Sequence, residues 1–261
     1  MEEYIIYVYM NEQKNSAMRE GGKILGGVLR DVQEYVKPGM TGKEIDAWVR
    51  AEIVRRGAGV AYDMLPKNES FPGAICISVN DAVIHGTPND EELSEGDKVS
   101  FDLDVYYKGY FTDSAVTMIV GGKEKGAPAV RKMLSVTEAA MWEGIEQVKP
   151  GARIGDISAA VEKVLRKGKL GVIENYVGHG IGKSMHEDPE VPNYGKKGHG
   201  YKLKVGDVIC IEPMSCLGKP KNYVDESDDW TVRLKDGSIG CHFEHSILVT
   251  ETGYEVLTLP E

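Results

Sequence analysis

The chain has 261 residues, of which 41% are hydrophobic and 28% are charged, and its formal net charge is −10. The acidic balance, with a pI near 5.2, argues against binding nucleic acid through a basic surface. The length allows a full hydrophobic core, and no apolar run approaches the length of a membrane span.

The N-terminus reads MEEYIIYVYM, a short apolar run preceded by acidic residues. A signal peptide carries Lys or Arg at that place, so we expect a cytoplasmic protein. We predict that residues 1–13 are a leader, either disordered or an extra edge strand, and that residues 14–261 form one domain. Met10 is an alternative start, and the sequence leaves open whether residues 1–9 belong to the natural protein.

Two segments further along the chain begin with the same four residues. VKPGMTGKEIDAWVRAEIVRRGA starts at Val36 and VKPGARIGDISAAVEKVLRKGKL starts at Val148. Both read as a Pro-Gly turn followed by an amphipathic helix. LSEGDKVSFDLDV from Leu93 and LKVGDVICIEPM from Leu203 both read as a Gly-Asp turn followed by a strand.

A third pair of segments, FTDSAVTMIVGG and HFEHSILVTETG, reads as an acid followed by an apolar strand. Three matched pairs in the same order predict two α/β halves related by an approximate two-fold axis. Because hairpin-like segments occur near residues 99–120, we expect mixed or antiparallel sheet flanked by helices, an α+β arrangement, rather than a doubly wound parallel sheet.

The repeat places carboxylates at equivalent positions. Asp102 corresponds to Glu212, and Asp113 corresponds to Glu244. Glu212 lies in VICIEPM, an almost wholly apolar run in which a carboxylate is costly to bury unless it is paired or bound to a metal. Asp104 shares a strand face with Asp102, and we interpret it as a supporting residue or as part of a solvent-facing acidic strand.

Four carboxylates at a two-fold axis repel one another by several kcal/mol per pair in a partly buried site, so they require cations. His179, in VGHGIGKSMHEDP, adds one imidazole, and such an oxygen-rich set suits Mn, Fe(II), Co or Zn. Two ions roughly 3.5–4 Å apart would bridge a water and polarise a carbonyl, which is hydrolytic chemistry. His85 is the repeat counterpart of His179, whereas His199, His242 and His245 are interpreted as hydrogen-bonded core or loop residues.

From about residue 14 to 259, the chain resembles the type I methionine aminopeptidases. The shared motifs are D-x10-D, GHGIG with a second His seven residues after the first, IEP and FEH. The resemblance implies the pita-bread fold, with two pseudo-symmetric halves around a dinuclear metal site. It also implies that Asp102 binds one ion, that His179 and Glu212 bind the other, and that Asp113 and Glu244 bridge the two.

The resemblance further implies removal of the initiator methionine from nascent proteins whose second residue is small. Glu212 would act as general base on the bridging water, and His186 would hydrogen-bond the substrate carbonyl and the oxyanion. His85 would contact the scissile amide or the substrate amine. The methionine side-chain pocket would have walls at Phe71, Cys76, Met185 and Trp230.

The segment LPKNESFPG, residues 65–73, is long for this loop, and we expect it to cover the cleft. Two alternatives remain: a prolidase or aminopeptidase P of the same fold, and a metal-free binding protein on the same scaffold. The expected partner is the N-terminal Met of nascent chains near the ribosome, and the expected state is a monomer that binds neither nucleic acid nor membrane. The four cysteines (Cys76, Cys210, Cys216 and Cys241) include no C-x-x-C pair, which argues against a zinc knuckle or a dithiol motif. An even count allows disulfides, but the size of the chain and its sparse cysteine usage favour free thiols.

Overall fold

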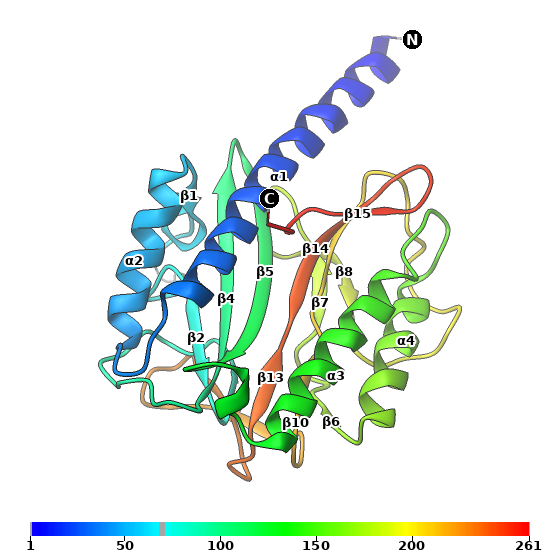
Figure 1. The fold of residues 1–261 in the computed structure, drawn as a ribbon. Coiled ribbons are helices and arrows are strands. Elements are labelled where there is room, and N and C mark those ends of the chain that lie inside the picture. Colours follow the sequence, from blue (N-terminus) through cyan, green and yellow to red (C-terminus); the bar gives the residue numbers. More distant parts are fainter. Residues whose placement is uncertain (1, 68–70, 261) are drawn as a thin grey trace.

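The computed structural model describes residues 2–67 and 71–260, with residues 2–11 as backbone only. Within these ranges, four α-helices lie on one face of a large sheet, which Figure 1 views from the helix side. They are α1 (Glu2–Tyr35), α2 (Gly42–Arg55), α3 (Pro128–Ile145) and α4 (Ile154–Lys167). No helix in the same ranges has both the length and the apolar character needed to cross a bilayer.

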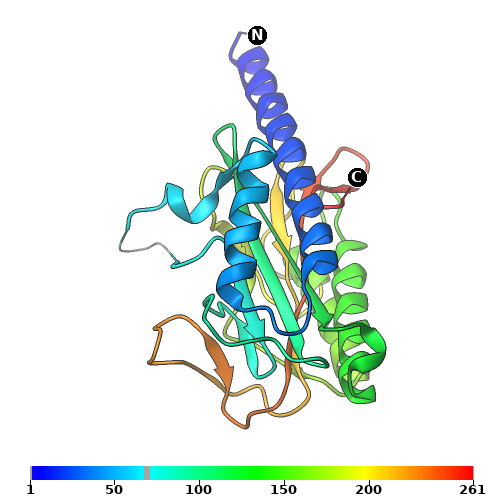
Figure 2. The same ribbon diagram turned by 60° about the vertical axis from the view of Figure 1, so that its left-hand side comes forward.

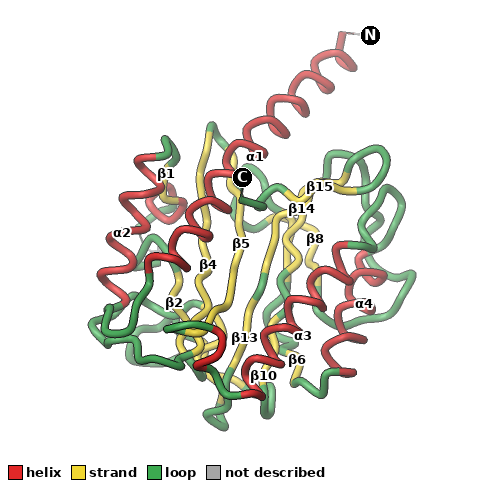
Figure 3. The backbone as a smooth tube through the Cα atoms, viewed as in Figure 1, coloured by secondary structure: helices red, strands yellow, loops and turns green. Residues whose placement is uncertain are grey.

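All strand pairings in the described chain are antiparallel, and Figure 3 shows the strands in yellow. The large sheet has the order β1 (Gly59–Val60), β4 (Lys98–Tyr107), β5 (Tyr110–Ile119), β14 (Glu244–Val249), β9 (Val208–Ile211), β7 (Gly178–Gly180) and β8 (Glu187–Val191). In addition, β2 (Cys76–Val79) pairs with β4, and β15 (Tyr254–Val256) pairs with β14.

The described chain also contains two smaller sheets of three strands each. One contains β13 (Gly240–His242), β10 (Met214–Cys216) and β6 (Gly171–Val172), and the other contains β11 (Asn222–Val224), β12 (Val232–Leu234) and β3 (Ala82–Ile84). Short 3-10 helices, Ala61–Met64 and Lys123–Lys125, lie in connecting segments. Figure 2 shows the β11–β12 loop projecting from the side of the sheet away from the helices.

The repeat in the sequence corresponds to equivalent elements in space. The two Gly-Asp turns lead into β4 and β9, and the two acid-led segments form β5 and β14. The pairs β4–β5 and β14–β9 are neighbours at the centre of the large sheet, so the approximate two-fold axis passes between β5 and β14. The two Pro-Gly turns precede α2 and α4. These equivalences confirm the predicted α+β fold of two related halves.

Each half has its own hydrophobic core between helices and sheet. In the first half, α2 buries Ile45 and Val49 in a cluster with Phe101 of β4. In the second half, α4 buries Ile157 and Val161 at the matching positions. Removing each of these side chains from water stabilises the fold by roughly 1.5–3 kcal/mol, so each helix pair packs firmly on its own side of the sheet.

The N-terminal segment differs from the prediction. Apart from residue 1, which lies outside the described residues, the leader is helical, because α1 begins at Glu2. Residues 2–11 contain no Gly or Pro and continue a helix that packs on β4 and β5. Extending a helix needs no new nucleation, whereas a strand needs a free sheet edge. In Figure 1 the end of α1 projects beyond the sheet. The boundary between residues 1–13 and 14–261 stays a prediction.

Lys98, at the start of β4, is a fully buried side chain that ties β2 to β3. Its Nζ donates hydrogen bonds to the carbonyl oxygens of Ser78 at 3.0 Å and of Ala82 at 2.9 Å. The hairpin that these contacts hold leads directly into His85. Burial lowers the pKa of Lys98 from its usual 10.5 to about 8.

This lowered pKa predicts a pH-dependent stability that Lys98→Met should remove. Between the folded pKa of about 8 and the unfolded pKa of 10.5, the unfolded chain binds the additional proton, so stability rises with pH. From about pH 7.5 to 10, the wild-type free energy of unfolding should therefore gain about 2 kcal/mol relative to the variant. Urea unfolding of both proteins at the two pH values measures this gain, and a constant difference between them would contradict it.

Candidate metal centre

The carboxylates of β4 and β5 face a common pocket. In the antiparallel register, Asp102 lies opposite Ala115 and Asp104 lies opposite Asp113. Because side chains alternate along a strand, Asp102 and Asp104 point to the same side of the sheet. All three aspartates are buried and line a cavity of about 500 Å³.

Two glutamates enter the same cavity from the second half. Glu212 follows the last residue of β9, and Glu244 begins β14. Ser114 Oγ donates a hydrogen bond to the backbone oxygen of Glu244 at 2.6 Å, and Asn193 Nδ2 donates one to that of Glu212 at 3.0 Å. These contacts hold both glutamates beside the pairing of β5 with β14, which we call the seam.

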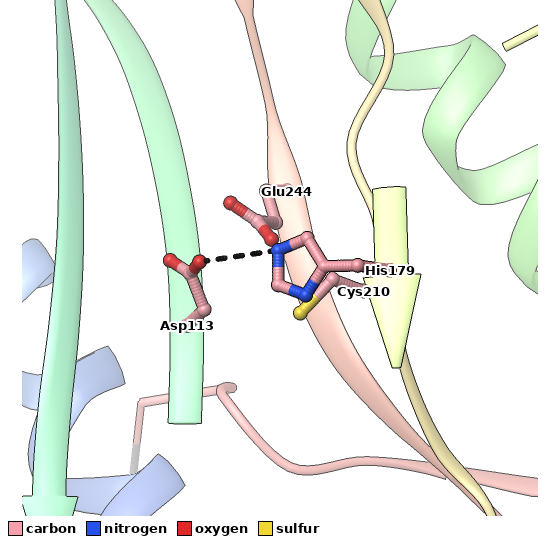
Figure 4. Close-up of side chains that lie close together, drawn as sticks. All are labelled: Asp113, His179, Cys210 and Glu244. Carbon is pink, nitrogen blue, oxygen red and sulfur yellow. Dashed lines mark ion pairs between the residues drawn. The ribbon is translucent and has the colours of Figure 1, made fainter. Parts of the chain in front are cut away.

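His179, on β7, faces these carboxylates through Nε2. Its Nδ1 lies 2.9 Å from the Gly180 carbonyl oxygen, which assigns the ring proton to Nδ1 and leaves the Nε2 lone pair free. Nε2 lies 3.4 Å from Glu212 Oε1 and 3.7 Å from Asp113 Oδ2. Figure 4 shows the ring directed at Asp113, with Glu244 and Cys210 close by.

Close backbone packing explains the glycines around His179. A Cβ on Gly178 would lie 2.3 Å from the Cys210 carbonyl oxygen, and a Cβ on Gly180 would lie 2.3 Å from that of Asp188. No side chain fits at either distance, so β7 can approach β8 and β9 this closely only with glycine on both sides of the histidine.

The carboxylates lack a compensating positive charge from the described protein. Burial, and then the charges of neighbouring carboxylates, raise the pKa values of Asp113, Glu212 and Glu244 well above their usual range. Burial likewise raises the pKa of Asp102, although His242 opposes this shift. Among the described atoms, Asp113 Oδ1 and Glu244 Oε1 are buried without a hydrogen-bond partner. The donor set therefore fits divalent cations, which would keep the carboxylates ionised.

The histidine next to these acids is suited to bind a metal. Burial, and then His186, lower the pKa of His179 to about 4, so its imidazole is neutral and can donate its lone pair. Ligand atoms of Asp113, His179, Cys210 and Glu244 all lie within 4.8 Å of one another. The structure thus brings together all the predicted ligands: Asp102, Asp113, His179, Glu212 and Glu244.

Asp104 is not part of a solvent-facing strand. Only 3% of the residue is exposed, and its Oδ1 has no hydrogen-bond partner among the described atoms. Burial, and then the charge of Asp102, raise its pKa well above the usual range. The alternation that assigned Asp104 to the face of Asp102 was right, but that face lines the cavity instead of bulk solvent.

The sequence interpretation of His242 as a hydrogen-bonded core residue is also wrong. It is 1% exposed, and neither ring nitrogen has a hydrogen-bond partner in the described part of the chain. It lies beside Asp102, Glu212 and Glu244. The signal in the sequence was its position two residues before Glu244. By contrast, His245 Nδ1 lies 2.8 Å from Thr258 Oγ1. This contact agrees with the interpretation of His245 as a hydrogen-bonded residue.

His85, which follows β3, and His186, which precedes β8, both line the cavity. His85 has a positive φ of 55°, a conformation that costs a non-glycine residue about 1 kcal/mol or more. Its ring meets Tyr176 edge-on at 6.0 Å between centroids. The His186 ring lies 4.4 Å from the ring of His179, and partial burial of the imidazole in the cavity lowers its pKa.

Aromatic and apolar side chains form the outer wall of the cavity. Phe71 packs edge-on against Trp230 at 5.4 Å and tilted against Tyr62 at 5.1 Å. Met185 also lines the cavity, whereas the Cys76 thiol is fully buried behind Tyr62, 3.7 Å from its hydroxyl. Residues 68–70 of the predicted cover lie outside the described residues, so coverage of the cleft by the whole loop stays a prediction.

Comparisons with known proteins cover nearly all of the chain. The family described as "Metallopeptidase family M24" matches residues 16–251. Methionine aminopeptidase 1 of Bacillus subtilis is 38% identical over 242 residues, which cover 92% of this chain and 94% of that protein. The crystal structure of methionine aminopeptidase from Rickettsia prowazekii has a TM-score of 0.89 at 36% identity, over 95% of this chain and 98% of that one.

A more distant solved structure is similar in fold alone. Prolidase from Pyrococcus furiosus has a TM-score of 0.73 at 22% identity, and the match covers 95% of this chain but 64% of the prolidase. The same fold therefore occurs in enzymes with other names and does not by itself select a substrate.

Proposed function

The chain belongs to metallopeptidase family M24, and on this premise we propose that it hydrolyses the N-terminal methionine from polypeptides whose second residue is small. The supporting observation is the buried cluster of carboxylates and His179 at the seam, in a chain that aligns with methionine aminopeptidases along almost its full length. We propose further that it acts as a cytoplasmic monomer on nascent chains near the ribosome.

The centre is proposed to hold two divalent ions, with Co, Mn, Fe(II) and Zn as candidates. Asp102 would hold one ion, His179 and Glu212 the other, and Asp113 and Glu244 would contribute to both. When bound, such ions lower the pKa of a water and polarise the substrate carbonyl. Burial of all five side chains supports this assignment, because without cations the carboxylates could not remain ionised together.

The side chains around the centre would handle protons and orient the substrate. Glu212 would accept the proton of the attacking water, since its carboxylate is already directed into the cavity. His186, at the mouth beside His179, would donate a hydrogen bond to the carbonyl oxygen on which negative charge develops. His85, across the cavity, would contact the scissile amide or the free amine of the substrate.

The outer cavity is proposed to take the methionine side chain. Phe71, Trp230 and Met185 offer apolar and sulfur contacts that suit an unbranched thioether. The next residue of the substrate would lie against the carboxylates and the segment of His85, where space is small. This position accounts for the proposed preference for a small second residue.

The proposed activity is tested with three peptides. Met-Ala-Ser should be cleaved well, whereas Met-Lys-Ser and Ala-Pro peptides should be cleaved poorly, with each candidate metal added in turn. The measurement is release of the first amino acid over time. Preferential cleavage of Ala-Pro would instead support a prolidase-like enzyme. Absence of stoichiometric metal after gentle purification would support a binding protein.

Asp102 and Asp104 should differ sharply in what they contribute to the centre. Asp102→Asn should lose one ion, because a neutral amide is a poorer ligand than a carboxylate. Asp104→Asn should keep its metal and lose only about tenfold in turnover, as expected of a residue that supports the ligands. Mass spectrometry of both variants measures their metal content. Equal metal loss from the two variants would show that Asp102 is wrongly assigned as the ligand.

A further inference from the structure

His242 lies on the buried side of the carboxylate cluster. It ends β13, two residues before Glu244, and the residue is 1% exposed. Both ring nitrogens lack hydrogen-bond partners among the described atoms. A buried imidazole without partners is costly, and at least one of its nitrogens therefore requires a partner that the described chain does not supply.

The distances around His242 point to a shared ion. Nε2 lies 3.6 Å from Glu212 Oε2 and 3.8 Å from Glu244 Oε2. Both separations exceed the 2.7–3.2 Å of an ordinary N–H···O hydrogen bond. Two ligand atoms that are each about 2.0–2.2 Å from one ion can lie up to about 4.4 Å apart, so both separations fit a common metal.

His179 and His242 stand in matching positions on either side of Glu212. His179 Nε2 is 3.4 Å from Glu212 Oε1, and His242 Nε2 is 3.6 Å from Glu212 Oε2. Each oxygen of this carboxylate thus faces one imidazole. Ligand atoms of Glu212, His242 and Glu244 lie within 4.8 Å of one another, as do those of the group that contains His179.

We propose that His242 is a metal ligand through Nε2, so that the centre contains two imidazoles, one on each side of Glu212. The inference rests on the proposed metal centre, and it adds a ligand that the carboxylates and His179 do not include. A second nitrogen donor would shift the preference of the centre from Mn towards Co and Zn. It would also give Nε2 of His242 a partner without adding to the negative charge of the cluster.

The test counts imidazole ligands in the cobalt(II)-loaded protein by proton NMR. A histidine that binds Co(II) through Nε2 keeps its proton on Nδ1, and that N–H signal is shifted far outside the ordinary range. We expect two such signals that disappear in D₂O, one from His179 and one from His242. His242→Gln should lose one of them and bind one ion more than 100-fold more weakly, beyond the 10- to 100-fold expected for an outer hydrogen-bond partner.

The matched control is His245→Gln, which removes an imidazole of the next strand, β14, that contacts Thr258 instead of the cluster. It should keep both signals and the wild-type metal affinity. A single signal in wild type, or two signals that persist in His242→Gln, would overturn the role of His242 while leaving the metal centre in place. Failure of the wild type to bind cobalt would overturn both. A single wild-type signal overturns the role of His242 even if His242→Gln does not fold, and His242→Asn then serves as the second variant that assigns the second signal.

Discussion

Glu212→Gln should lose turnover by on the order of 10²–10⁴-fold while the protein still binds metal. Glutamine keeps the size of the side chain and one acceptor oxygen, so it can still approach an ion. It has no negative charge and cannot accept the proton of the attacking water. Turnover of Met-Ala-Ser and metal content, measured on the same preparation, test both statements together.

The outcome for Glu212→Gln separates two properties of one carboxylate. Loss of turnover with metal retained supports the assignment of Glu212 as general base. Near-normal turnover would contradict it. A protein with no metal would show that the charge of this carboxylate is essential for binding, and the test of its role as base would then require Glu212→Asp as a second variant.

His186→Ala should lose turnover by on the order of 10²–10³-fold with full metal content. The His186 ring is exposed at the mouth of the cavity and touches the His179 ring, whereas the predicted ligands are buried below it. Its removal should therefore leave the ions in place and withdraw only the hydrogen bond to the developing oxyanion. Single-turnover kinetics and metal analysis provide the two measurements.

Retention of turnover by His186→Ala would exclude a role in the chemical step. Loss of metal from the same variant would mean that His186 contacts an ion, contrary to the proposed role. His199→Ala is a suitable control, because His199 is an exposed histidine outside the residues that line the cavity.

The carboxylates of the centre could be predicted because the chain repeats itself. The pairs Asp102 and Glu212, and Asp113 and Glu244, follow from aligning the two copies, and strand alternation directs the side chains to one face. A carboxylate in an apolar run also indicates a charge that must be compensated, which identified Glu212. Periodicity and burial cost therefore predicted that these carboxylates lie together, as they do in the cavity.

The surroundings of some residues could not be predicted, because they depend on which distant segments pack over a strand face. Alternation placed Asp104 beside Asp102 but could not say that the second half of the molecule closes over that face. His242 stands two residues before Glu244, and a lone histidine in an apolar run is usually a satisfied core residue. The helical state of residues 2–11 was missed for a different reason, because YIIYVY is as compatible with a strand as with a helix.

The seam has a mechanical consequence for the pocket. β4 and β5 are in register over ten residue pairs, whereas β5 and β14 share only the pairs Glu244–Ala115 and His245–Ser114. The backbone pairing across the seam is therefore short, although buried residues of both halves, such as Phe111 and Ile181, also pack in one cluster. Repelling carboxylates lie next to the seam, so ions bound there would add a link between its two sides. Because one wall of the pocket belongs to the first half through Phe71 and another to the second half through Met185, the width available to a side chain would then be set by the metal as well as by the protein.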